Sequence, residues 1–115
     1  MRAARLFFPL LLLGACGPSL PTPAVGDHLG DTPIAVPIAP PPGKAEVIPP
    51  RPADLKQPVW IDGEWEWTGR RWQWKNGRWE EAPRGQVFAP AILVRRNDGS
   101  FAYFPGAWKA AAGGK

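Results

Sequence analysis

The stretch that decides the fold is Trp60–Glu80, WIDGEWEWTGRRWQWKNGRWE. It consists of three consecutive segments of seven residues, each with a Trp at its first position and a second Trp five residues later. A turn signal that contains glycine lies between the two Trp residues of each segment: Asp62-Gly63, Gly69-Arg70 and Asn76-Gly77. An internal repeat of this kind constrains the fold more than any other feature of a sequence.

A period of seven is also typical of coiled coils, but these segments do not fit one. A coiled coil needs two apolar seams carried over several turns by good helix formers, whereas a glycine interrupts each segment here. Asp-Gly and Asn-Gly are the strongest short hairpin signals, and Trp, Ile and Thr favour strands. The sequence therefore predicts an all-β fold, a small antiparallel meander of short strands linked by two-residue turns.

The meander register places all six Trp side chains on one face, because side chains alternate between the two faces of a strand. The predicted opposed pairs are Trp60 with Trp65, Trp67 with Trp72, Trp65 with Trp74, and Trp74 with Trp79. The opposite face is predicted to be solvated, with Glu64 opposite Lys75, and carries the residues Glu64, Glu66, Arg71, Gln73, Lys75 and Arg78.

The C-terminal part continues the β pattern. Short strands are expected at 87–89, 91–95 and 100–104, with a turn at Asn97-Asp98-Gly99. Tyr103 to Trp108 repeats the aromatic-x-x-Gly-x-Trp spacing and is interpreted as a diverged copy. The predicted β domain spans 58–109, and 110–115 is expected to be a flexible tail.

The N-terminus is typical of export. Arg2 and Arg5 precede an apolar run, 6–13, which is too short to span a bilayer. A charged start, a short apolar run and small residues at its end predict a secretory signal peptide over 1–15. The only cysteine of the chain, Cys16, follows directly and has no second cysteine with which to form a disulfide.

Leu13-Gly14-Ala15-Cys16 resembles the lipobox of bacterial lipoproteins. The resemblance implies cleavage before Cys16, a diacylglyceryl group on its sulfur and, usually, an acylated amino terminus. Two or three acyl chains would hold the protein on a lipid bilayer essentially permanently. Gly17 stands where inner-membrane lipoproteins often have Asp, so the resemblance favours the outer membrane of a bacterial cell envelope.

The spacings Trp60-x-x-Gly63-x-Trp65 and Trp74-x-x-Gly77-x-Trp79 resemble the WxxGxW (YXWQ-type) repeats of short exported bacterial proteins and lipoproteins. The resemblance covers about 20 residues strongly and Tyr103 to Trp108 weakly. It implies an exported bacterial repeat protein and carries no biochemical activity with it.

Between Cys16 and the Trp repeats, 16–57 is expected to be a disordered proline-rich tether. The stretch 17–58 holds 12 of the 16 prolines and no aromatic residue, so it buries too little apolar surface to offset the entropy of ordering. It is interpreted as a spacer in preference to a docking ligand for a proline-recognising partner. His28, the only histidine, is expected to be solvated there.

Composition argues against several classes of function. The net charge is +4, of which Arg2 and Arg5 belong to the predicted signal peptide, so nucleic acid is not an expected partner. A lone histidine and a lone cysteine do not make a metal site, and no cofactor is expected. Glu64 and Glu66 share a face as a carboxylate pair, but Lys75 and Gln73 oppose them, so no enzyme is predicted.

The Trp face supports more than one interpretation. Six indoles bury enough surface to form most of a small core, and left open they would expose far more apolar area than a soluble monomer usually does. Flat aromatic rows also suit sugar rings, so cell-wall glycan is an alternative ligand, and another envelope protein or self-association is a third. The predicted function is a membrane-anchored envelope lipoprotein with a non-catalytic structural or binding module, and its possible ligand-binding residues are Trp60, Trp65, Trp67, Trp72, Trp74 and Trp79.

Overall fold

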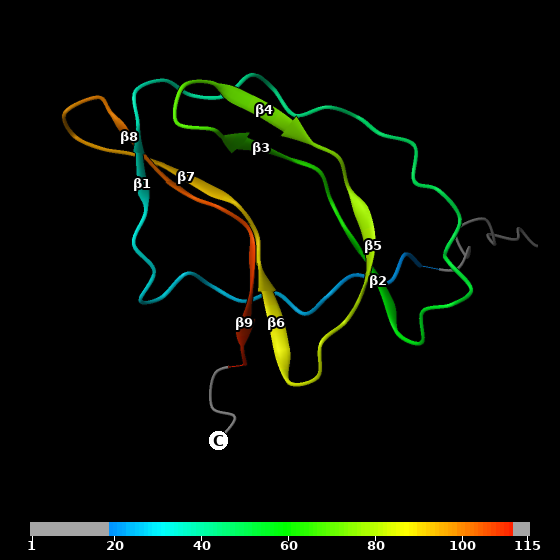
Figure 1. The fold of residues 1–115 in the computed structure, drawn as a ribbon. Helices are drawn as coiled ribbons and strands as arrows, with labels where there is room; N and C mark the ends of the chain where they lie inside the picture. The colour runs from blue at the N-terminus through cyan, green and yellow to red at the C-terminus, as the bar shows by residue number, and fades with distance from the viewer. Residues whose placement is uncertain (1–18, 112–115) are drawn as a thin grey trace, which may run out of the picture.

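The computed structural model describes residues 19–111, and all regular secondary structure in this range is β. The predicted all-β class, with short antiparallel strands in hairpins, is confirmed. Figure 1 shows two long hairpins side by side, with the N-terminal part of the chain wrapped around them. The strands are β1 (Ile34–Val36), β2 (Pro58–Ile61), β3 (Glu64–Trp67), β4 (Trp72–Lys75), β5 (Arg78–Glu81), β6 (Gln86–Ala89), β7 (Ile92–Arg95), β8 (Phe101–Phe104) and β9 (Ala107–Ala110).

The Trp repeats form one long hairpin. β3 pairs with β4 and β2 pairs with β5, both antiparallel. The tip is a two-residue turn in which Thr68 N–H donates to Arg71 O at 3.0 Å. Gly69 has φ of 100° and is the only tip residue with positive φ, which is the pattern of a II′ turn. The predictions that Trp67 pairs with Trp72, that Trp65 pairs with Trp74 and that Glu64 lies opposite Lys75 are confirmed.

The predictions of turns at Asp62-Gly63 and at Asn76-Gly77 are wrong. The predicted pairs Trp60 with Trp65 and Trp74 with Trp79 do not form, because Trp60 of β2 pairs with Trp79 of β5. The chain therefore continues in the same direction through Asp62-Gly63 and through Asn76-Gly77 instead of turning back. These two segments interrupt the strand pairing at the same level of one long hairpin. Neither glycine of these two segments has positive φ, which a type I′ turn would require.

The second hairpin repeats this plan. β6 pairs with β9 and β7 pairs with β8. Arg96 N–H donates to Ser100 O at 2.8 Å across the predicted Asn97-Asp98-Gly99 turn, and Gly99 has φ of 91°. This is a three-residue loop with its glycine in the left-handed region. The expected strands of this part are confirmed as β6, β7 and β8.

The core lies between the two hairpins. Val59, Ile61 and Phe88 form its buried centre, and Ala82 and Trp108 pack against them. Two of these, Val59 and Ile61, alternate with Trp60 along β2, so the hairpin turns its non-Trp face inward.

The predicted solvated face is therefore partly buried. Glu64 and Arg78 are half-buried rather than solvated, because the second hairpin covers this side of the sheet. Tyr103 O–H donates to Trp65 O at 2.6 Å, and Trp108 Nε1 donates to Glu80 Oε1 at 2.8 Å. These bonds join one hairpin to the other.

The residues before β2 differ most from expectation. Described from residue 19 onward, they lie along both hairpins instead of forming a free tether. Residues 21–28 cross from one hairpin to the other: Trp60 N–H donates to Pro21 O at 2.8 Å and Phe88 N–H to Ala24 O at 2.8 Å. β1 then adds a third strand beside β8. Proline carbonyls accept hydrogen bonds as well as any others, so a proline-rich segment is ordered where the folded domain supplies donors.

Candidate functional site

The Trp face consists of three indole pairs that follow one another along the first hairpin. The ring centroids are 5.4 Å apart for Trp60 and Trp79, 5.2 Å for Trp65 and Trp74, and 5.1 Å for Trp67 and Trp72. All three pairs meet edge to face, the geometry that the ring quadrupole favours. Trp60 is buried and the other five are half-buried. The structure thus brings together all six predicted site residues.

This face is covered by residues 37–51, which we call the strap. The strap leaves β1 and runs along the outside of β4 and β5 before entering β2 (Figure 1). Its main-chain carbonyls accept hydrogen bonds from three indoles. Trp72 Nε1 donates to Ile38 O at 3.0 Å, Trp65 Nε1 to Pro42 O at 3.1 Å, and Trp79 Nε1 to Pro49 O at 2.9 Å.

Glu46 fixes the middle of the strap. Its Oε2 accepts from Trp74 Nε1 at 2.8 Å, and its Oε1 accepts from Gly77 N–H at 2.9 Å. A charged acceptor with two donors is among the stronger hydrogen-bonded arrangements in proteins. Cations on either side lie over the indoles: Lys44 Nζ is 5.3 Å from the Trp65 ring and Arg51 Cζ is 5.9 Å from the Trp79 ring.

The glycines of the repeats make room for these contacts. A Cβ at Gly63 would stand 2.4 Å from Cζ2 of Trp74, and a Cβ at Gly77 would stand 2.5 Å from Cζ2 of Trp60. Both would also stand 3.0 Å from Glu46 Oε1. In this hairpin, the glycine of each WxxGxW copy is thus the surface on which the first Trp of the other copy packs.

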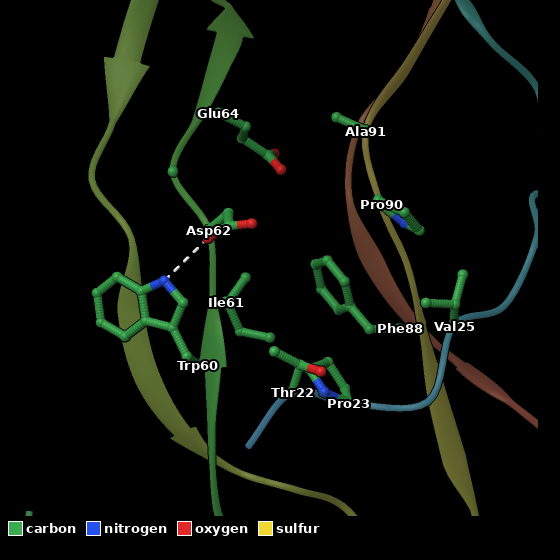
Figure 2. Close-up of a pocket in the computed structure, with 11 residues that line it drawn as sticks. Thr22, Pro23, Val25, Trp60, Ile61, Asp62, Glu64, Phe88, Pro90 and Ala91 are labelled. Atoms are coloured by element: carbon green, nitrogen blue, oxygen red, sulfur yellow. Dashed lines mark hydrogen bonds between the residues drawn. The ribbon is translucent and has the colours of Figure 1, made fainter. Parts of the chain in front are cut away.

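A hollow lies on the inner side, between the hairpins. Figure 2 shows Ile61 and Phe88 facing each other across it, with the Glu64 carboxylate at one end. Its cavity volume is about 270 Å³. Asp62 lines the same end, and its Oδ1 accepts from Trp60 Nε1 at 2.9 Å. The hollow is apolar with carboxylates at one rim.

The pKa values of two carboxylates on the inner side, Glu64 and Glu80, shift in opposite directions. Burial raises the pKa of Glu64, although the Gly106 amide and the charges of Lys75 and Arg78 act against that rise. Burial also acts to raise the pKa of Glu80, but hydrogen bonds from Trp108 and Arg78 outweigh it and the pKa is lowered.

His28 is buried and bonded, contrary to the prediction that it is solvated. It is 9% exposed, and its ring centroid lies 5.1 Å from that of Phe104. Nε2 donates to Pro90 O at 2.7 Å, and Nδ1 lies 2.9 Å from Asp31 Oδ2. Asp31 also accepts from Lys109 Nζ, and hydrogen bonds from Lys109 and His28 lower the pKa of its carboxyl. These contacts hold residues 28–31 on the second hairpin.

Sequence reasoning missed two groups. Glu46 lies in a stretch expected to be disordered. Only its hydrogen bonds to Trp74 and Gly77 in the structure identify it as part of the site. Phe88 and Leu93 occupy the positions of a fourth copy, Phe88-x-x-Ala91-x-Leu93. They pair with Trp108 and Tyr103 as Trp60 and Trp65 pair with Trp79 and Trp74. A Cβ at Gly106 would stand 3.0 Å from Phe88 Cζ, so this glycine also packs against the aromatic ring of a partner copy.

The predicted lipidation site, Cys16, and the predicted signal peptide lie outside the described residues. Within 19–111, no group of three or more His, Cys, Asp or Glu side chains converges to hold a metal ion. The same range contains no helix long and apolar enough to cross a membrane. No family model, curated protein or solved structure matches this chain.

Proposed function

We propose that this chain is a bacterial envelope lipoprotein, anchored to a bilayer through acylated Cys16, whose two-hairpin domain is a non-catalytic binding module. The anchor is inferred from the signal peptide pattern and the lipobox resemblance. The outer membrane is favoured over the inner membrane by Gly17.

The observation that carries the binding role is the way the Trp face holds the strap. Three indole N–H groups donate to main-chain carbonyls of an extended, proline-rich segment. Aromatic grooves that bind extended proline-rich chains use the same combination of flat rings and donors to backbone carbonyls. The contacts at the Trp face are of a recognition type.

Cell-wall glycan is the second candidate ligand, and the indole rows are the observation that favours it. Aromatic rings pack against the apolar faces of sugar rings, and the rings here lie in rows. Because the strap covers these rings, a glycan would reach them only after the strap is displaced.

The anchor is tested by fractionation. Cys16→Ser in the full chain should move the protein from the membrane fraction to the soluble fraction, because the acyl chains are lost. Ser19→Ala is the matched control, since it changes a nearby small polar residue without removing the sulfur. A Cys16→Ser chain that stays in the membrane fraction would refute the lipoprotein assignment.

A further inference from the structure

The strap lies on the Trp face as a surface layer rather than as part of the core. Its apolar side chains point largely into solvent: Val47 is 93% exposed and Ile38 is 57% exposed. The core residues Val59, Ile61 and Phe88 lie on the other side of the hairpin and make a cluster of their own. The strap is therefore held mainly by its polar contacts to the Trp face.

Those polar contacts recognise a backbone, not a particular row of side chains. The face supplies donors at Trp72, Trp65 and Trp79, and the strap supplies carbonyl acceptors four and seven residues apart, at Ile38, Pro42 and Pro49. Any extended chain has such carbonyls. A proline-rich chain fits best, because it is extended before it binds and has few N–H groups that lose water without a partner.

Glu46 adds a side-chain requirement. The cradle formed by Trp74 Nε1 and Gly77 N–H accepts one carboxylate, and Gly63 and Gly77 leave the space for it. Lys44 and Arg51 place cations over the rings on either side of that carboxylate. The strap thus fits this face as an extended proline-rich segment with one acidic residue between basic ones.

The contacts that hold the strap on the Trp face are separate from the strand pairs that hold its two ends. The strap is joined to the hairpins at both ends by strand pairs of its flanks, β1 with β8 and β2 with β5. Neither pairing uses the hydrogen bonds between the strap and the indoles. The strap competes as a tethered segment, whose effective concentration is in the millimolar range, so a separate peptide gains access when the strap is weakened.

We propose that the Trp face is a binding site for an extended proline-rich peptide of another envelope protein, and that residues 37–51 occupy it as an internal ligand. This rests on the proposed function, of which it names the ligand class.

The probe is a labelled synthetic peptide of residues 37–51, PIAPPPGKAEVIPPR. The protein is the full chain with Cys16→Ser, with and without Glu46→Gln, which removes the charge from the strap's acidic contact. Binding is measured by fluorescence anisotropy. The Glu46→Gln chain should bind the peptide about tenfold more tightly than its parent, because losing a charge-assisted hydrogen bond weakens the internal competitor by roughly that factor.

Two matched controls make the test specific to the cradle. The same peptide with Gln in place of Glu46 should bind the Glu46→Gln chain about tenfold more weakly than the parent peptide. Trp74→Phe in the Glu46→Gln chain keeps an aromatic ring but removes one of the two donors of the cradle, and should reduce the preference for the acidic peptide. Near-ultraviolet circular dichroism establishes that each variant is folded.

Three results would overturn the proposal. The first is a folded Glu46→Gln chain whose indoles have become accessible to a quencher but which binds the peptide no better than its parent. The second is a concentration-dependent dimer that the peptide does not dissociate, which would assign the face to a second copy. The third is displacement of the strap by peptidoglycan fragments and not by the peptide. Membrane fractionation is independent of all three, so failure of the peptide test leaves the anchor untouched.

Discussion

Gly77 lies directly against the indole of Trp60, so that a Cβ at Gly77 would stand 2.5 Å from Cζ2 of Trp60 and 2.8 Å from Ile61 O. Trp60 is 4% exposed, and Ile61 O belongs to the backbone of β2, so rotating a side chain would not relieve the clash. The glycine of the repeat is required for close packing between two strands, because real Cβ atoms do not approach other atoms this closely.

Gly77→Ala should therefore destabilise the domain by about 1–3 kcal/mol, the usual cost of overpacking. The measurement is urea unfolding followed by Trp emission. Gly43→Ala is the matched control, since a Cβ there meets nothing within 4 Å and its φ is not positive. The control should be neutral or slightly stabilising through the unfolded chain. Equal effects of the two substitutions would contradict the packing role.

The glycines of the first hairpin explain why some turns of the fold are predictable from the sequence and others are not. The tip at Gly69 is local, since a turn residue and its strands lie next to one another, and its register was predicted correctly. Asp62-Gly63 carries an equally strong turn signal, but its glycine serves the contact with Trp74. A single sequence does not distinguish a glycine needed for positive φ from one needed for close approach.

The covering of the Trp face was beyond sequence reasoning for a different reason. The contacts of the strap join a carbonyl or a carboxylate to an indole about 30 residues away. Every residue has a carbonyl, so these contacts leave no periodic pattern. The Trp residues themselves were identified as the candidate site, whereas Glu46 was not, because its partners are supplied by tertiary packing.

Tyr103 should make the domain sensitive to alkali. Burial raises the pKa of its phenol, with the charges of Glu64 and Glu66 adding to the effect. A group whose pKa is higher in the folded state contributes stability below its unfolded pKa, about 10, and loses it as pH rises further. Tyr103 is the only tyrosine, so the phenolate ultraviolet absorbance reports it alone. Phenolate should appear together with unfolding and well above pH 10.

Tyr103→Phe separates the phenol from general alkaline damage. The variant loses the hydrogen bond to Trp65 O and should be less stable at neutral pH by about 1 kcal/mol. Its stability should fall less steeply above about pH 10 than that of the parent chain. Phenolate forming in the folded parent chain at its ordinary pH would contradict the burial of Tyr103.

Asp31 should make the domain sensitive to acid. Hydrogen bonds from Lys109 and His28 lower the pKa of this carboxyl. A lowered pKa gives stability that is present above the unfolded value, about 4, and is lost as pH falls through the folded value. Thermal melts should show Asp31→Asn to be less stable than the parent at neutral pH, with the difference shrinking in acid. Asp54→Asn, in a turn of the chain before β2, is the control and should show neither effect.

Glu64 should behave in the opposite sense. Burial raises the pKa of its carboxyl, so the ionised form is disfavoured in the folded chain and opposes folding above the folded pKa. Glu64→Gln keeps an oxygen that accepts from the Gly106 amide and removes the buried charge. The variant should unfold at higher urea concentration than the parent at neutral pH, and the two should converge as pH falls and Glu64 is protonated.

Glu66→Gln is the matched control for Glu64→Gln. Glu66 lies two residues along β3, and its carboxylate is half-exposed beside Lys75 Nζ at 3.6 Å. A surface ion pair of this kind contributes less than about 1 kcal/mol, so this variant should be neutral or slightly destabilised. A Glu64→Gln chain that is less stable than the parent at neutral pH would mean that the attraction of Lys75 and Arg78 outweighs the burial of the charge.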